Sequence, residues 1–242
     1  MPIAFAVCFV LIAGLSEVLR QGVFGLGPVE IAAMVYGAFA LAAAFILRTD
    51  IIAIFRPSEN GLYGHARLGW TWRRTMTGLV LAPLLCLVPL GFAAATGQTP
   101  ALPDRLEPLA VAFFTQSLLP ALCAELFFRE AAVKSFGDST AAMVIASCLA
   151  WFTFCLPQGL EPALIAAGTG LWLLTLRLIG TNILAVAAIH AALVVAFDGV
   201  IPLDLGGMEI RVYAICFTVG AAILSFTVLA FMTRDGKELR YA

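Results

Sequence analysis

The sequence predicts an all-α protein, a polytopic transmembrane helical bundle of about eight spans with its N- and C-termini in the cytoplasm. Of the 242 residues, 62% are hydrophobic and 12% are charged, whereas soluble domains are about 45–50% apolar and about 25% charged. The apolar residues come in blocks of about twenty, which is the length that crosses a hydrocarbon core about 30 Å thick. We therefore expect a single transmembrane domain over residues 1–242, with the bilayer as its solvent.

The candidate spans follow one another without a repeat or a separate soluble domain. They cover residues 3–19, 29–47, 77–96, 109–128, 140–156, 163–178, 182–197 and 213–232. The first block lacks a basic n-region and a clear cleavage site, so we expect it to remain as a span rather than to be removed as a signal peptide. The longest polar interval, residues 48–75, contains aliphatic and tryptophan residues that favour a position along the membrane interface.

The distribution of Lys and Arg predicts the orientation, because cytoplasmic loops retain positive charge. With eight spans, Arg20, Arg105 and Arg211 fall on one side of the membrane, and the other eleven of the fourteen basic residues fall on the opposite side, with both termini. This bias predicts cytoplasmic termini and a multi-pass protein of the cell (inner or plasma) membrane.

Charge and cysteine content argue against several classes of partner. The formal net charge is −1 and no Lys/Arg-rich stripe occurs, so we expect no nucleic-acid partner. All six cysteines fall inside apolar blocks without CxxC or Cys/His metal spacing, which indicates small buried apolar residues rather than disulfides or ligands. We expect no metal and no cofactor, and we expect membrane lipids as partners.

Few ionisable residues lie inside the apolar blocks, and such residues are candidates for function because they are costly at membrane depth. Glu125 and Arg129 in the fourth block are spaced i, i+4, so they share a helix face and can form a charge-assisted pair. His190 lies in the seventh block. Both features also have a purely structural interpretation. A buried ion pair can serve only to orient its helices, and a lone histidine in an apolar helix more often forms a hydrogen bond to a neighbouring helix. The other histidine, His65, lies in the long polar interval and is expected to be solvated.

Four short runs resemble the motifs of the CAAX protease and bacteriocin-processing family. The run AELFFR at 124–129 resembles the Glu-Glu-x-x-x-Arg motif, and AWFTFCL at 150–156 resembles the Phe-x-x-x-His segment. Residues 170–178 resemble the family's glycine-containing helix that ends in Leu-Arg, and IHAALV at 189–194 resembles His-x-x-x-Asn. The resemblance covers about residues 108–198, and the family's eight-helix, cytoplasmic-ended plan agrees with the predicted spans.

The resemblance implies a glutamic-type intramembrane peptidase. The family includes type II prenyl proteases that cut lipidated C-terminal tails and bacterial members that process membrane-anchored peptides. In the family a glutamate and a histidine hold the attacking water, a second histidine and an asparagine serve the oxyanion, and a second glutamate and an arginine hold the site together. This alignment implies Glu125 and His190 as candidate catalytic residues with Arg129 in support.

The same alignment places non-reactive residues at three family positions. Ala124 stands at the water-activating glutamate, Leu156 at the second-motif histidine and Val194 at the asparagine. Each loss can reduce a rate by about 10²–10³. Helix rise also puts Leu156 deeper than the other two positions, unless the fifth span begins inside the interface or the alignment is shifted.

Three hypotheses for function remain open at this stage. The first is a peptidase that still processes a membrane-anchored peptide or a CAAX-type C-terminus, with Glu125 as the base or with Gln158 or Glu161 as replacements. The second is a proteolytically silent relative that binds a peptide, a lipid or a membrane partner. The third is a small transporter or channel in which the ionisable residues line a pathway.

Overall fold

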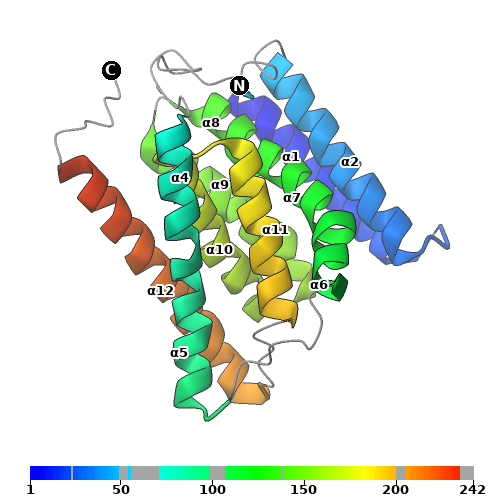
Figure 1. The fold of residues 1–242 in the computed structure, drawn as a ribbon. Coiled ribbons are helices and arrows are strands. Elements are labelled where there is room, and N and C mark those ends of the chain that lie inside the picture. The colour runs from blue at the N-terminus through cyan, green and yellow to red at the C-terminus, as the bar shows by residue number, and fades with distance from the viewer. Residues whose placement is uncertain are drawn as a thin grey trace.

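The computed structural model of the chain describes residues 1–22, 24–48, 54–55, 71–98, 107–137, 139–199 and 205–234. Helices are the only regular structure in these ranges, and they pack side by side as a bundle (Figure 1). Most of the polar interval 48–75, including His65, lies outside the described residues. The all-α prediction is confirmed.

Within the described ranges, the helices form eight segments in chain order, matching the eight predicted blocks. The first two are α1 (Pro2–Arg20) and α2 (Pro28–Leu47), and the third joins α4 (Trp72–Leu81), the 3₁₀ helix η2 (Ala82–Cys86) and α5 (Leu87–Ala95). The fourth joins α6 (Glu107–Val111), η3 (Ala112–Ser117), α7 (Leu118–Glu125), η4 (Leu126–Ala131) and α8 (Ala132–Phe136). The last four are α9 (Thr140–Cys155) with η5 (Leu156–Gln158), α10 (Leu160–Leu178), α11 (Ile183–Gly199) and α12 (Gly207–Arg234).

Six of these segments are long and apolar enough, by length and composition, to cross a bilayer. The apolar part of α11, Ile183–Phe197, is shorter, and α10 carries Glu161 in its first turn and Arg177 in its last. The outer surface of the bundle is apolar as well, since large aliphatic side chains such as Ile3 and Val80 are about four-fifths exposed, at 80% and 77%. The chain is therefore a multi-pass membrane protein.

The start of α1 and the end of α12 lie at the same end of the bundle (Figure 1). This agrees with a plan in which both termini face one side of the membrane. Which side they face stays a prediction. Two of the basic residues behind that prediction, Arg129 and Arg177, are 0% exposed and lie in the protein interior rather than in a loop. Without these two arginines, nine Lys and Arg residues still fall on the predicted cytoplasmic side and three on the other side.

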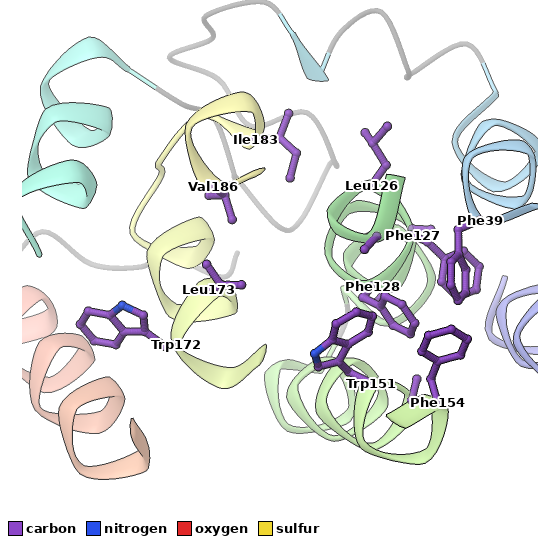
Figure 2. Close-up of a cluster of buried hydrophobic side chains, with 14 of the residues drawn as sticks. Phe39, Leu126, Phe127, Phe128, Trp151, Phe154, Trp172, Leu173, Ile183 and Val186 are labelled. Atoms are coloured by element: carbon purple, nitrogen blue, oxygen red, sulfur yellow. The ribbon is translucent and has the colours of Figure 1, made fainter. Parts of the chain in front are cut away.

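An aromatic cluster fixes the three segments that surround the interior site. Phe39 of α2 lies 4.9 Å, centroid to centroid, from Phe128 of η4, and Phe128 lies 4.6 Å from Trp151 of α9. Phe127 and Phe154 complete the cluster, which Figure 2 shows with its rings converging from α2, η4 and α9. Tilted and edge-on rings at these separations are the favoured aromatic geometries. The cluster therefore holds α2, η4 and α9 in fixed positions.

Small residues of α10 allow close helix packing. A Cβ atom on Gly168 would lie 3.1 Å from the backbone of Thr218 in α12, so only glycine allows this approach without a shift. The six cysteines are all free, but the prediction that they are buried is wrong for Cys216, which is exposed. In a membrane protein the exposed surface is itself an apolar environment, so an apolar block does not imply burial in the protein.

Candidate functional site

The centre of the site is a contact between Glu125 at the end of α7 and His190 in the middle of α11. Glu125 Oε1 lies 2.8 Å from His190 Nδ1, and the Glu125 side chain is 1% exposed. A carboxylate oxygen can only accept, so Nδ1 is the donor of this bond. The proton of this bond therefore lies on Nδ1 of His190. The other ring nitrogen, Nε2, has no hydrogen-bond partner among the described residues.

Arg129 neutralises the same carboxylate from the next helical turn. Its Nε lies 3.2 Å from Glu125 Oε2, which confirms the pair that the i, i+4 spacing predicted. Nη1 of Arg129 donates to Ser147 Oγ of α9 at 3.0 Å, and Ser147 in turn donates to the carbonyl of Phe128 at 2.6 Å. The guanidinium is 0% exposed, so Glu125, Arg129 and His190 form one buried charge-assisted network.

Gly170 of α10 makes room for this guanidinium. A Cβ atom there would lie 3.3 Å from Arg129 Nη2 and 3.2 Å from Trp151 Cδ1. Both separations are tighter than ordinary van der Waals contact. The absence of a side chain at Gly170 therefore leaves the space that the buried Arg129 side chain occupies.

A second buried ion pair lies one residue further along the chain. Glu130 accepts a hydrogen bond from Nε of Arg177 in α10, and Arg177 Nη1 donates to the carbonyl of Thr181 at 3.1 Å. Arg129 and Glu130 both fall in η4, a π-helical stretch, and such stretches are frequent at functional sites. Successive residues of η4 therefore join two different neighbours, α9 through Arg129 and α10 through Glu130.

A cavity of about 230 Å³, here called the polar cavity, opens beside His190. It lies between α2, η3, α7, α9, η5 and α11, and its wall includes Gln116, Ser117 and Gln158. A second cavity of about 430 Å³, here called the apolar cavity, lies between α9, α10, α11 and α12. The two cavities share five wall residues, namely Trp151, Cys155, Gln158, His190 and Val194.

The cavities bring together some of the residues that the alignment singled out. Ala124 lines the polar cavity and Val194 lines both, next to His190. Leu156 lines neither cavity and is 43% exposed, and its assignment to the second-motif position stays a prediction. Cys155 lines both cavities instead, because a shift of one residue on a helix turns a side chain by about 100°. The sequence had indicated such a shift through the excess depth of Leu156.

No residue that lines either cavity is an Asp, Glu, Lys or Arg. Gln158 lines both cavities, whereas Glu161 pairs with Arg211 of α12 at 3.3 Å. Within the described ranges no three His, Cys, Asp or Glu residues lie close enough together to hold a metal ion. The walls therefore offer hydrogen bonds and one imidazole to an occupant.

An apolar helical bundle with a buried carboxylate, guanidinium and imidazole beside a cavity defines a polytopic membrane protein with an interior candidate site. Residues 106–196 match the family model described as Rce1-like, type II CAAX prenyl endopeptidase. Over nearly the range that the motifs indicated, the chain is thus similar to this endopeptidase family. No curated protein and no solved structure matches the chain.

Proposed function

We propose that this CAAX-protease-like membrane protein binds a membrane-anchored peptide in the cavities beside His190 and does not hydrolyse it by the family's glutamate–water route. The observation that carries the proposal is that the residue next to Glu125 on the cavity wall is Ala124. Activation of water in this family requires a carboxylate that faces the cavity. Here no carboxylate lines either cavity.

Glu125 does not replace the missing carboxylate, because both of its oxygens already have partners. Oε1 bonds to His190 and Oε2 pairs with Arg129, and the side chain is 1% exposed. Turning Glu125 into the cavity would leave Arg129 buried without a counter-charge, which is strongly unfavourable. Glu125 therefore acts as an internal brace between α7 and α11.

The other two family positions also lack the groups needed for hydrolysis. Cys155, on the cavity wall near the second-motif position, carries a thiol where an imidazole would help to hold water, and Val194 offers no donor to an oxyanion. Since removing one such donor typically lowers a rate by about 10²–10³, three losses together reduce hydrolysis by this route to a negligible level.

Binding does not depend on those three groups. The polar cavity offers Gln116, Ser117 and Gln158 to the amide groups of a peptide backbone, and the apolar cavity offers a wall that includes Ile165, Leu193 and other aliphatic and aromatic residues to its side chains. Pockets with mostly apolar walls and a few polar groups are typical of ligand sites. A peptide anchored in the same bilayer matches this combination.

The geometry of His190 favours one second candidate, a residual hydrolase that uses the imidazole as its base. A carboxylate at Nδ1 with Nε2 facing a cavity is the arrangement by which triads orient a histidine. Nε2 would take a proton from water as the water oxygen attacks a peptide carbonyl, and would return the proton to the leaving amine. His190→Ala separates the two candidates, because it abolishes cleavage only if this second route operates.

The proposal is tested by cleavage and binding of a fluorescent membrane-anchored peptide in nanodiscs. We expect the native protein to bind the peptide without cutting it. Val194→Trp, which fills both cavities, should abolish binding, whereas Leu184→Trp on the same helix should not, because Leu184 is exposed and lines neither cavity. Cleavage of the peptide by the native protein, lost in His190→Ala, would overturn the proposal that the protein binds the peptide without hydrolysing it.

A gain-of-function variant tests the assignment of the family positions. Ala124→Glu, Cys155→His and Val194→Asn together restore the three missing groups on the cavity wall. We expect this triple variant to cleave the peptide, and we expect no cleavage when Leu156→His replaces Cys155→His, because Leu156 does not line the cavity. Cleavage by the Leu156 version alone would contradict the assignment of Cys155.

A further inference from the structure

Arg20, the last residue of α1, lies beside a wall residue of the polar cavity. Its guanidinium carbon lies 5.8 Å from the centroid of the Phe154 ring, and Phe154 is part of the cavity wall. This contact places the positive charge of Arg20 next to the wall of the cavity, although Arg20 is not itself one of the residues that line it.

Arg20 forms no ion pair within the described part of the chain. Glu17 lies one turn earlier on α1, and its Oε1 accepts a hydrogen bond from Gln21 at 3.4 Å. The polar cavity has no acidic wall residue. By contrast, the arginines of the interior and of α12 have partners, since Arg129 pairs with Glu125 and Arg211 pairs with Glu161. Arg20 therefore presents an unpaired guanidinium to whatever occupies the cavity.

A guanidinium favours an anion with two coplanar oxygens, because it presents parallel N–H donors. A peptide in the cavity supplies such an anion in one place, its C-terminal carboxylate. The volume agrees with a chain end, since about 230 Å³ is below the roughly 300–1,000 Å³ of sites for larger ligands.

We propose that Arg20 binds the free C-terminal carboxylate of the peptide that the cavities hold. This inference rests on the proposed function and specifies the class of ligand. The last residues of the peptide occupy the polar cavity, with the terminal carboxylate on Arg20, and the preceding apolar side chains occupy the apolar cavity. Because the two cavities share the wall at Trp151, Cys155 and His190, one extended segment can occupy both.

Arg48 provides a matched control for Arg20. Its guanidinium carbon also lies 5.8 Å from an aromatic centroid, that of Phe45, and it also follows the end of a helix, α2. Neither Arg48 nor Phe45 lines either cavity. Replacing Arg48 thus removes an equivalent cation from an equivalent aromatic contact without touching the proposed site.

The experiment compares two dansylated apolar tetrapeptides, one with a free C-terminal carboxylate and one with a C-terminal carboxamide. Binding is measured by fluorescence to the full chain in phosphatidylcholine nanodiscs. We expect the carboxylate form to bind the native protein roughly ten- to hundredfold more tightly, which is the usual strength of a hydrogen bond to a charged group. This ratio should fall to about one in Arg20→Gln, remain partly in Arg20→Lys, and persist in Arg48→Gln.

Each alternative result has a separate meaning. Equal affinity of the two peptides for the native protein would overturn the role of Arg20 while leaving peptide binding intact. Binding of neither peptide would overturn the proposed function and this inference with it. Phosphatidylglycerol tests the alternative that Arg20 binds a lipid phosphate. If the carboxylate preference disappears when this lipid is added, and if the lipid itself binds in an Arg20-dependent way, the proposal that Arg20 binds a peptide carboxylate is overturned.

Discussion

Glu125 and His190 lie 65 residues apart in the chain, yet their side chains meet at 2.8 Å in the interior of the bundle. The contact joins the end of α7 to the middle of α11, and Arg129 adds a cation on the other carboxylate oxygen. In a setting with little water, each of the three groups relies on the other two to offset the cost of removing it from solvent. The stability of the bundle therefore depends on all three.

Glu125→Gln should destabilise the protein strongly. The amide keeps the shape of the carboxylate but leaves Arg129 buried without its counter-charge, which costs about 3 kcal/mol or more. Thermal unfolding in detergent, followed by tryptophan fluorescence, measures the change. Glu161→Gln is the control, because its partner Arg211 is 67% exposed and such pairs contribute less than about 1 kcal/mol. Equal effects of the two variants would contradict the buried network.

Gly170→Ala should also destabilise the protein, because its Cβ would press on both Arg129 and Trp151. Overpacking of this kind typically costs about 1–3 kcal/mol. Gly37→Ala in α2 should instead stabilise the protein. Nothing lies within 4 Å of a Cβ there, and alanine is the better helix former by up to about 1 kcal/mol. The two melting temperatures, measured under the same conditions, should thus move in opposite directions. A rise in both would show that Arg129 does not need the space.

The number and order of the helices could be predicted because a span in lipid must be apolar over a fixed length. The ends of the helices could not. The fourth segment was predicted to end at 128 but continues through η4 to Phe136. Hydropathy falls at Arg129 and Glu130, yet both charges are paired inside the protein and do not end the helix. A sequence window cannot distinguish a charge at the interface from a charge with a buried partner.

The candidate site could be predicted only in part, because a sequence pattern shows contacts within one helix but not contacts between helices. The pairing of Glu125 with Arg129 follows from their spacing on one helix, whereas the contact with His190 depends on how α7 packs against α11. The choice between Cys155 and Leu156 is a rotation of about 100°, which motif spacing alone did not resolve. Arg20 could be predicted only as a charge at the end of a span, because its position beside Phe154 arises from packing between α1 and α9.

Single substitutions in the Glu130–Arg177 pair should be harmful, and the double substitution should restore most of the stability. Both side chains are 0% exposed, so Glu130→Leu or Arg177→Met alone removes one partner of a buried ion pair and costs about 3–5 kcal/mol. Replacing both by apolar residues of similar size removes both charges of the pair. A double-mutant cycle of melting temperatures measures this coupling. Additive effects of the two substitutions would contradict a direct pair.

The orientation of the bundle is the remaining prediction, and it decides from which side a peptide end would reach Arg20. The distribution of basic residues predicts that both termini lie in the cytoplasm, and the end of α1 that carries Arg20 lies at the opposite end of the bundle from its start (Figure 1). A green fluorescent protein fused to the C-terminus should therefore fluoresce, and alkaline phosphatase fused after Gly97, which follows α5, should be active. Reversed signals would put the end of α1 that carries Arg20 in the cytoplasm. The carboxylate that Arg20 binds would then belong to a cytoplasmic tail, whereas the predicted orientation requires a peptide whose C-terminus lies on the outer side of the membrane.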